Sequence, residues 1–179
     1  MESNTLPTLS THNSTSLDQA LVHLMGSRIA QIHFVCCNLT EPQSWESGHL
    51  TLDSGVLIET TQGWLSWVWL EDRHNGGPGF QLSTEPILPI MEADPYLHFT
   101  HLKTGGNWGV LLESKIEEIL PHFQRNLYTG EMLCGLELKT TRGILTISGI
   151  EEPDPDNPTE LAVLPFAADW TLLKLAPNP

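Results

Sequence analysis

Basic residues are scarce in this chain. It has 8 lysines and arginines against 22 aspartates and glutamates in 179 residues, which gives a formal net charge of −14. A surface with this excess of negative charge repels phosphate, so we expect no direct binding to nucleic acid or to an anionic membrane. The same excess favours solubility and, where a macromolecular partner exists, a basic protein.

Cysteine is scarce as well, with three residues in all. Cys36 and Cys37 are adjacent and only Cys134 remains, so a framework of paired disulfides is excluded and buried thiols are expected. No stretch approaches 18 continuous apolar residues, and the first residues lack a basic region followed by an apolar run. Together these absences predict a cytoplasmic protein.

Sequence signatures of catalysis and of nucleotide binding are missing. The chain has no Gly-x-Ser-x-Gly, no Gly-Lys-Ser/Thr phosphate loop and no Gly-x-Gly-x-x-Gly after a strand; residues 105–109 are best interpreted as a turn. A nucleophile made from Cys36 or Cys134 and a histidine is disfavoured, because burial in an apolar strand disfavours the thiolate. We therefore predict no enzymatic activity and no cofactor.

Metal-ligating residues form no recognised pattern. His98 and His101 lie three residues apart in an extended segment, where they point to opposite faces and share an ion only at a bend. The acidic run at residues 151–156 is interrupted by prolines and lacks the EF-hand pattern, which favours a solvated loop over a calcium site. The sequence thus predicts no metal site. Other histidines would join His98 and His101 only through the fold: His33, His49, His74 and His122.

What the chain does contain is a repeat. Residues 56–67 align without a gap on residues 136–147, and both segments carry Thr-Thr-x-Gly-x-Leu. A second match, residues 27–32 on residues 114–119, lies upstream. The spacing between the two matched segments is about seven residues shorter in the second copy, which a loop can absorb. Two matches in the same order predict a duplicated unit, with chance similarity between short β segments as the alternative.

Each copy has the pattern of a β-hairpin. The first copy predicts strands over residues 49–60 and 63–71, with a break at residues 53–55, and the second predicts strands over residues 133–140 and 143–150. The glycine at the same place in each turn is expected to supply a positive φ. Alternation of apolar and polar residues in the second copy predicts one buried and one solvated face.

The predicted fold class is α+β, mostly β, with internally duplicated antiparallel β-meander or hairpin units and one N-terminal helix packed on the sheet. The helix is predicted from Ser16, the expected N-cap, to Gly26, because the apolar residues between them recur on one face. The predicted organisation is a flexible segment at residues 1–14 and a single compact domain at 15–176, made of two related halves at about 27–72 and 114–152 with closing strands within 160–175.

Tryptophans are the remaining candidates for recognition. Trp67 and Trp69 share one face of a predicted strand, and Trp64 faces the other way. Most of the tryptophans are expected in the core, but Trp67 and Trp69 would form an aromatic platform for a sugar or a protein if they were exposed. The second copy has isoleucine in place of Trp64 and Trp67, which favours packing over a ligand site.

Three functional classes fit these features. The leading hypothesis is an acidic protein-binding module, such as an immunity or inhibitor protein that neutralises a basic toxin or another cationic protein. The alternatives are a small-ligand or carbohydrate-binding β domain and a structural or assembly protein, as a monomer or a small homo-oligomer.

The leading hypothesis predicts that exposed carboxylates accept hydrogen bonds from lysine or arginine of the partner. For each of these residues the alternative is a surface charge that only keeps the protein soluble. The predicted partner-binding residues are Glu41, Glu46, Glu71, Asp72, Glu151, Glu152, Asp154 and Asp156.

Overall fold

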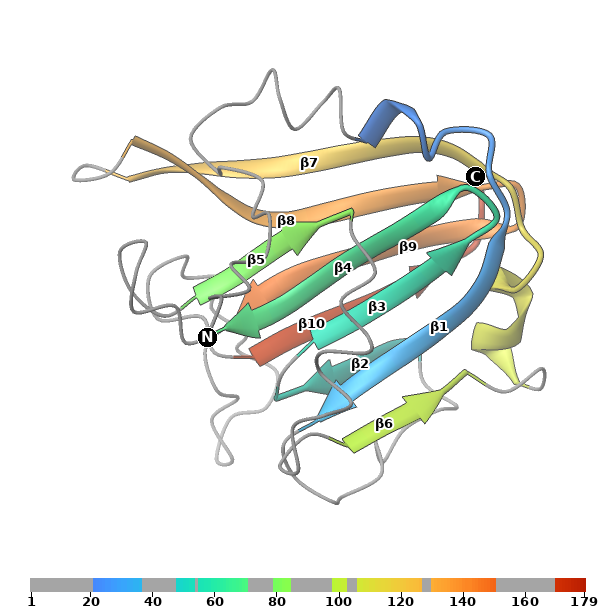
Figure 1. Cartoon of the computed structure of the whole chain (residues 1–179), viewed down its shortest axis with the longest axis horizontal. Helices are drawn as coiled ribbons and strands as arrows, with labels where there is room; N and C mark the ends of the chain where they lie inside the picture. The colour runs from blue at the N-terminus through green and yellow to red at the C-terminus, as the bar shows by residue number, and fades with distance from the viewer. Residues whose placement is uncertain are drawn as a thin grey trace, which may run out of the picture.

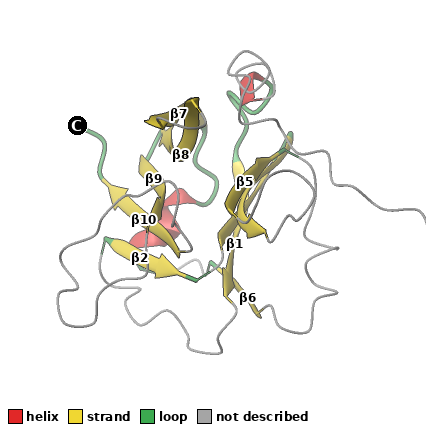
Figure 2. Cartoon of the chain, turned by 90° about the vertical axis from the view of Figure 1, so that its left-hand side faces the viewer, coloured by secondary structure: helices red, strands yellow, loops and turns green. Residues whose placement is uncertain are grey.

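The computed structural model describes residues 21–36, 48–53, 55–70, 79–84, 98–102, 106–126, 130–150 and 170–179. Within them the protein consists of two antiparallel β-sheets of five strands each, which lie face to face (Figures 1 and 2). The prediction of a mostly β fold is confirmed. Sheet one contains β1 (Ile29–Cys36), β3 (Gly55–Thr60), β4 (Gly63–Leu70), β5 (Gly79–Ser83) and β6 (His98–His101). Sheet two contains β2 (His49–Leu52), β7 (Ile116–Asn126), β8 (Gly130–Thr140), β9 (Gly143–Ile150) and β10 (Trp170–Ala176).

Each sheet combines strands consecutive in sequence with strands from elsewhere in the chain. Sheet one has the order β5-β4-β3-β1-β6 and sheet two the order β2-β10-β9-β8-β7. The predicted break near Asp53 is real, and it separates two sheets: β2 pairs with β10, whereas β3 pairs with β1 and β4. The sequence pattern marked the break but carried no information about this change of sheet.

Residues 1–14 and the first five residues of the predicted helix, 16–20, lie outside the described residues. Leu21 and Val22 are helical, and a turn leads from them to Gly26. A short 3₁₀ helix, η1 (Asn107–Leu111), precedes β7. Among the described residues, no helix is long and apolar enough to cross a membrane.

The core fills the space between the two sheets. Alternate residues of each strand face it, as the period of a β-strand requires. In β8 the predicted faces are confirmed, because Leu136, Leu138 and Thr140 are buried whereas Glu137 and Lys139 are only partly so. The largest fully buried side chains include Trp67, Trp108, Phe34, Leu50, Leu52 and Ile58.

Two hairpin turns at one end of the sandwich make the same hydrogen bonds. The Thr60 hydroxyl donates to the Gly63 carbonyl and accepts from the Gln62 amide, at 2.8 and 3.2 Å. The Thr140 hydroxyl does the same with Gly143 and Arg142, at the same two distances.

The predicted role of the two turn glycines holds only in part. Gly63 has a φ of 154°, but Gly143 does not have a positive φ. Glycine is needed at Gly143 for a different reason, since a Cβ there would lie 3.0 Å from the Ala176 carbonyl oxygen of β10. The second turn thus uses glycine for close approach of two strands.

The two sheets are joined at this end by reciprocal backbone hydrogen bonds. The Ile29 amide donates to the Ser114 carbonyl at 3.0 Å, and the Ile116 amide donates to the Ser27 carbonyl at 2.8 Å. Between them, Arg28 and Lys115 form an antiparallel bridge. Strands β1 and β7 therefore start side by side, which fixes the sheets relative to each other.

A tight turn precedes each of these strands. Ser27 donates its amide to Leu24 and Ser114 donates its amide to Leu111, both at 3.1 Å. The third residue of each turn is left-handed, with a φ of 83° at Gly26 and 62° at Glu113. Leu112, the second residue of the turn before β7, has a φ of −64° and a ψ of 137°. That turn is therefore of type II, in which glycine is preferred at the third position.

Candidate functional site

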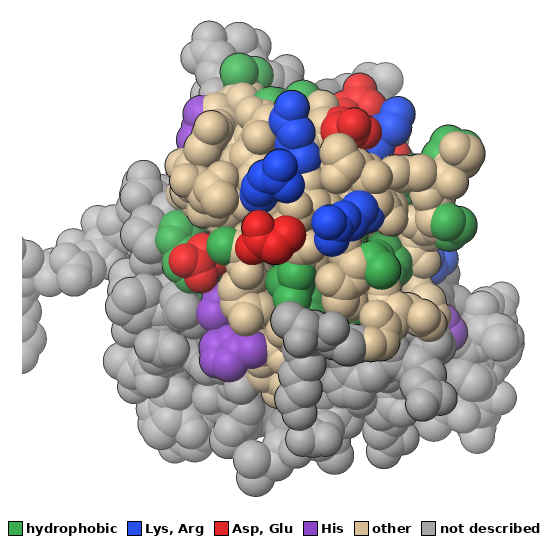
Figure 3. Space-filling view, turned by 90° about the vertical axis from the view of Figure 1, so that its right-hand side faces the viewer, with side chains coloured by type: hydrophobic (Ala, Val, Ile, Leu, Met, Phe, Trp, Pro, Cys, Tyr) green, Lys and Arg blue, Asp and Glu red, His purple; other side chains and the backbone are tan. Residues whose placement is uncertain are grey.

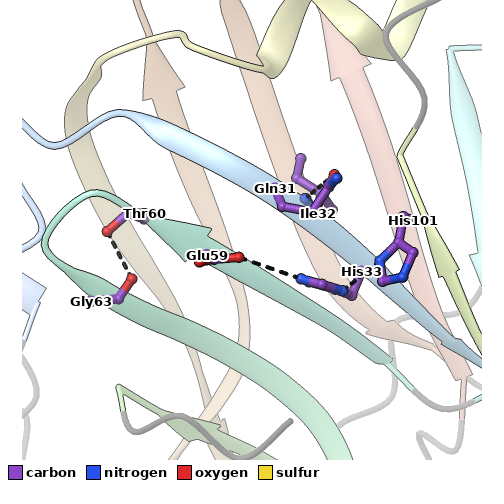
Figure 4. Close-up of polar contacts among 7 residues, drawn as sticks. All are labelled: Gln31, Ile32, His33, Glu59, Thr60, Gly63 and His101. Atoms are coloured by element: carbon purple, nitrogen blue, oxygen red, sulfur yellow. Dashed lines mark hydrogen bonds and ion pairs between the residues drawn. The ribbon is translucent and has the colours of Figure 1, made fainter.

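A histidine pair lies on the outer face of sheet one, away from the core. Strand pairing places His33 of β1 directly opposite His101 of the edge strand β6. On the other side of β1, strand β3 contributes Glu59, and its neighbour β4 contributes Trp64 opposite Glu59. Four strands thus bring together a carboxylate, two imidazoles and an indole. Figure 4 shows the carboxylate of Glu59 and the imidazoles of His33 and His101.

The two imidazoles are in direct contact. Nδ1 of His33 lies 2.8 Å from Nδ1 of His101, and the Glu59 carboxylate lies 3.8 Å from Nε2 of His33. The Trp64 ring stacks on His33 with a centroid distance of 5.7 Å. Since a hydrogen bond needs one N–H and one lone pair, at least one ring is neutral. Glu59, His33 and His101 therefore form a continuous row of polar side chains across three strands.

Burial differs along this row, in which His33 is the middle member. His33 is 5 % exposed, whereas His101 is exposed to solvent. Val35 and Leu57, on the same outer face, are fully buried but do not belong to the core between the sheets. The outer face of sheet one is therefore covered at its centre. The outer face of sheet two differs, since Leu120 on it is 41 % exposed.

Extended geometry at His98 and His101 is confirmed, since both lie in β6 three residues apart. The structure pairs His101 with His33, which sequence reasoning did not single out, because only the register of β1 against β6 brings them together. Among the described residues, no group of three or more histidine, cysteine or carboxylate side chains is placed to hold a metal ion.

The covered outer face also contains an unsatisfied hydroxyl. Ser66 of β4 is fully buried, and its Oγ has no hydrogen-bond partner within the described part of the chain. A buried hydroxyl without a partner loses its hydration and gains nothing in return. Its neighbour in β3 is the buried Leu57.

Replacement of Ser66 by alanine is expected to raise the free energy of unfolding by about 1 kcal/mol, because it removes the unsatisfied hydroxyl. The matched control is Thr140→Val, which removes a hydroxyl with two hydrogen bonds and is expected to cost about 1 to 2 kcal/mol. Urea unfolding followed by circular dichroism measures both. Equal destabilisation by the two substitutions would mean that Ser66 Oγ has a partner, such as a buried water molecule.

Among the described cysteines, Cys36 and Cys134 are free and partly buried. Cys134 lies at a β-bulge in β8 and donates its thiol hydrogen to the His122 carbonyl at 3.2 Å. Burial raises the pKa of the Cys134 thiol, against a smaller lowering by that backbone hydrogen bond. The expectation that burial disfavours the thiolate is confirmed at this residue.

Basic side chains gather at the end of the sandwich where the two sheets join. Figure 3 shows Lys and Arg side chains on this face with acidic side chains between them. Arg28 donates from Nη1 to the Glu113 carbonyl at 2.9 Å, and Arg142 donates from Nη1 to the Leu112 carbonyl at 3.2 Å. Lys115 is the bridge partner of Arg28. We call these three residues, Arg28, Lys115 and Arg142, the basic end.

The residues predicted to bind a partner are not brought together within the described part of the chain. Trp67 is 1 % exposed and packs between the sheets, so it is not available for an aromatic platform. Trp69 belongs to β4, but its side chain lies outside what the structure describes. The acidic candidates all lie outside the described residues: Glu41, Glu46, Glu71, Asp72, Glu151, Glu152, Asp154 and Asp156.

Similarity to characterised proteins assigns no role to any of these residues. No protein-family model, no curated protein and no solved structure matches the chain.

Proposed function

We propose that the protein is a non-catalytic, cytoplasmic protein-binding module that engages a cationic protein through acidic segments between its strands. An immunity or inhibitor protein that neutralises a basic toxin is the specific form of this proposal. The strands act as a scaffold, and the connecting segments supply the carboxylates that accept hydrogen bonds from lysine and arginine.

The observation that carries the proposal is the charge of the chain. Its 22 acidic residues against 8 basic residues give a formal net charge of −14. Four of the acidic residues lie within residues 151–156. Such a concentration of negative charge attracts lysine and arginine of a cationic partner and speeds the encounter of the two proteins.

We further infer that the scaffold arose by internal duplication. Support comes from the sequence repeat together with the paired hydrogen bonds of Thr60 and Thr140 and the paired turns before β1 and β7. Both strand pairs also have an irregularity at the same place, between Ile29 and Gln31 and between Ile116 and Glu118. The helix over residues 16–26 belongs to the same proposal, supported by the burial of Leu21 and Leu24.

Affinity capture from the native cell extract at low salt, followed by a salt step and mass spectrometry, tests the function. We expect one stoichiometric basic protein, which is then purified and titrated against two variants of equal charge. The test variant replaces Glu151, Glu152, Asp154 and Asp156 by their amides. The control variant replaces Glu113, Glu117, Glu118 and Glu137 by glutamine.

The test variant is expected to bind the captured protein at least about tenfold more weakly, whereas the control changes affinity only slightly because its carboxylates lie on the scaffold. Equal weakening by both variants would reduce the interaction to non-specific attraction by net charge. An empty eluate at adequate expression would reject the cationic partner.

A further inference from the structure

We propose that the basic end binds a phosphoryl group between the guanidinium groups of Arg28 and Arg142. This site uses scaffold residues only, so it goes beyond the proposed binding of a cationic protein by the acidic segments. Binding at this site can be tested in the absence of the cationic partner, so the two proposals can fail independently.

Both guanidinium groups are hydrogen-bonded to the same turn. Arg28 and Arg142 come from opposite sheets, yet they donate to the carbonyls of two consecutive residues, Glu113 and Leu112. Each contact involves Nη1 alone, which leaves the other N–H donors of each guanidinium free for a ligand. The two side chains thus offer several donors in one small region.

The turn that carries these carbonyls is fixed by its own hydrogen bonds. Ser114 donates its amide to Leu111 across the turn, and Glu113 donates its amide to Ile29 of β1 at 2.8 Å. The anchor points of both arginines are therefore set by the fold before any ligand arrives. Such preorganisation lowers the entropy lost on binding.

The charges at this end are not neutralised by the protein. No carboxylate of the described residues lies at ion-pair distance from Arg28, Lys115 or Arg142, although Glu113 is adjacent in the turn. Arg28 and Lys115 are directly opposite each other in a bridge, where like charges are unfavourable. A bound anion would remove this repulsion.

The negative charge of the whole chain does not prevent binding here. At physiological ionic strength, charges are screened over about 8 Å. The acidic residues far from this end therefore contribute little to the potential there, and the exposed Glu113 and Glu117 are the acidic residues nearest in sequence to Lys115.

The number and geometry of the donors favour a phosphoryl group over a carboxylate. A carboxylate has two oxygens and one charge, and one arginine is enough to bind it in a bidentate way. A phosphoryl group carries about −1.5 to −2 charges and three acceptor oxygens at neutral pH. It can accept from two guanidinium groups at once and neutralise both.

Titration calorimetry with inorganic phosphate and with ethyl phosphate, at constant ionic strength, tests the site on the full chain. We expect saturable binding that Arg28→Gln or Arg142→Gln each weakens by about tenfold. Arg142→Lys keeps the charge but loses the fork, and is expected to weaken binding less. Glu113→Gln removes the neighbouring negative charge and is expected to strengthen binding.

The matched control is Lys174→Gln, which removes an exposed cation from β10 of sheet two. It is expected to leave the affinity unchanged. Binding of both probes assigns the site to the phosphoryl group, and binding of inorganic phosphate alone assigns it to the free anion. Absence of saturable binding, or equal weakening by Lys174→Gln and Arg28→Gln, overturns the proposal. Circular dichroism confirms that each variant is folded, and Glu113→Gln gives a gain of affinity that unfolding cannot imitate.

Discussion

Replacement of Gly135 by alanine is expected to lower the free energy of unfolding by about 3 kcal/mol, because the added methyl group has no room. A Cβ at this position would overlap the Ile147 carbonyl oxygen of β9 and lie 3.3 Å from Cα of Ser148. Both neighbours are backbone atoms inside a sheet, so neither can move without breaking the pairing of β8 with β9. A loss of this size lowers the melting temperature by roughly 6 to 12 °C.

Gly106→Ala is the matched control for this prediction. Gly106 has a φ of 77° but no atom within 4 Å of an added Cβ, so the substitution introduces backbone strain without a clash. We expect it to cost about 1 kcal/mol. Differential scanning calorimetry distinguishes the two. A Gly135→Ala protein as stable as Gly106→Ala would show that β8 and β9 can separate at this point.

Gly135 also shows what a sequence pattern leaves out. It lies where β8 makes its last pair with β9, next to the bulge at Cys134. The sequence shows a glycine inside an apolar run, which indicates a bulge or a close approach but does not tell which strand approaches. The neighbour, Ile147, is 12 residues away and becomes known only through the register.

The hairpins were predictable because their information is local. Thr-Thr-x-Gly specifies a turn in which a threonine hydroxyl bonds to the backbone two and three residues further on, and both copies form it. The alternation around this turn sets the buried face of β8. The assignment of β2 to sheet two is not local, because it depends on pairing with β10, more than 100 residues away in the chain.

The histidine pair illustrates the same limit for a candidate site. His33 and His101 are 68 residues apart, and neither belongs to a motif. Two strands aligned one residue differently would place the rings on opposite faces of the sheet. The acidic residues predicted to bind a partner were selected from the sequence as exposed loops, and all of them lie outside the described residues.

Replacement of Trp67 by alanine is expected to cost about 3 to 5 kcal/mol of unfolding free energy. Trp67 is 1 % exposed and lies in β4 between Val56 of β3 and Leu82 of β5, which are buried in the same core. Loss of the indole leaves a cavity that rigid strands on both sides cannot close. Urea unfolding measures the loss. A binding platform predicts the opposite result, which is unchanged stability with loss of ligand or partner binding.

Two further variants separate packing from recognition at Trp67. Trp67→Ile introduces the residue found at the matching position of the repeat, Ile147, which is fully buried in β9. It is expected to cost less than alanine because it refills part of the cavity. Trp64→Ala removes a half-buried ring that stacks on His33, and about 1 kcal/mol is expected. Equal loss of stability in Trp67→Ala and Trp64→Ala would show that Trp67 is not a core residue. If Trp67 packs between the two sheets, Trp67→Ala costs the most unfolding free energy of the three variants.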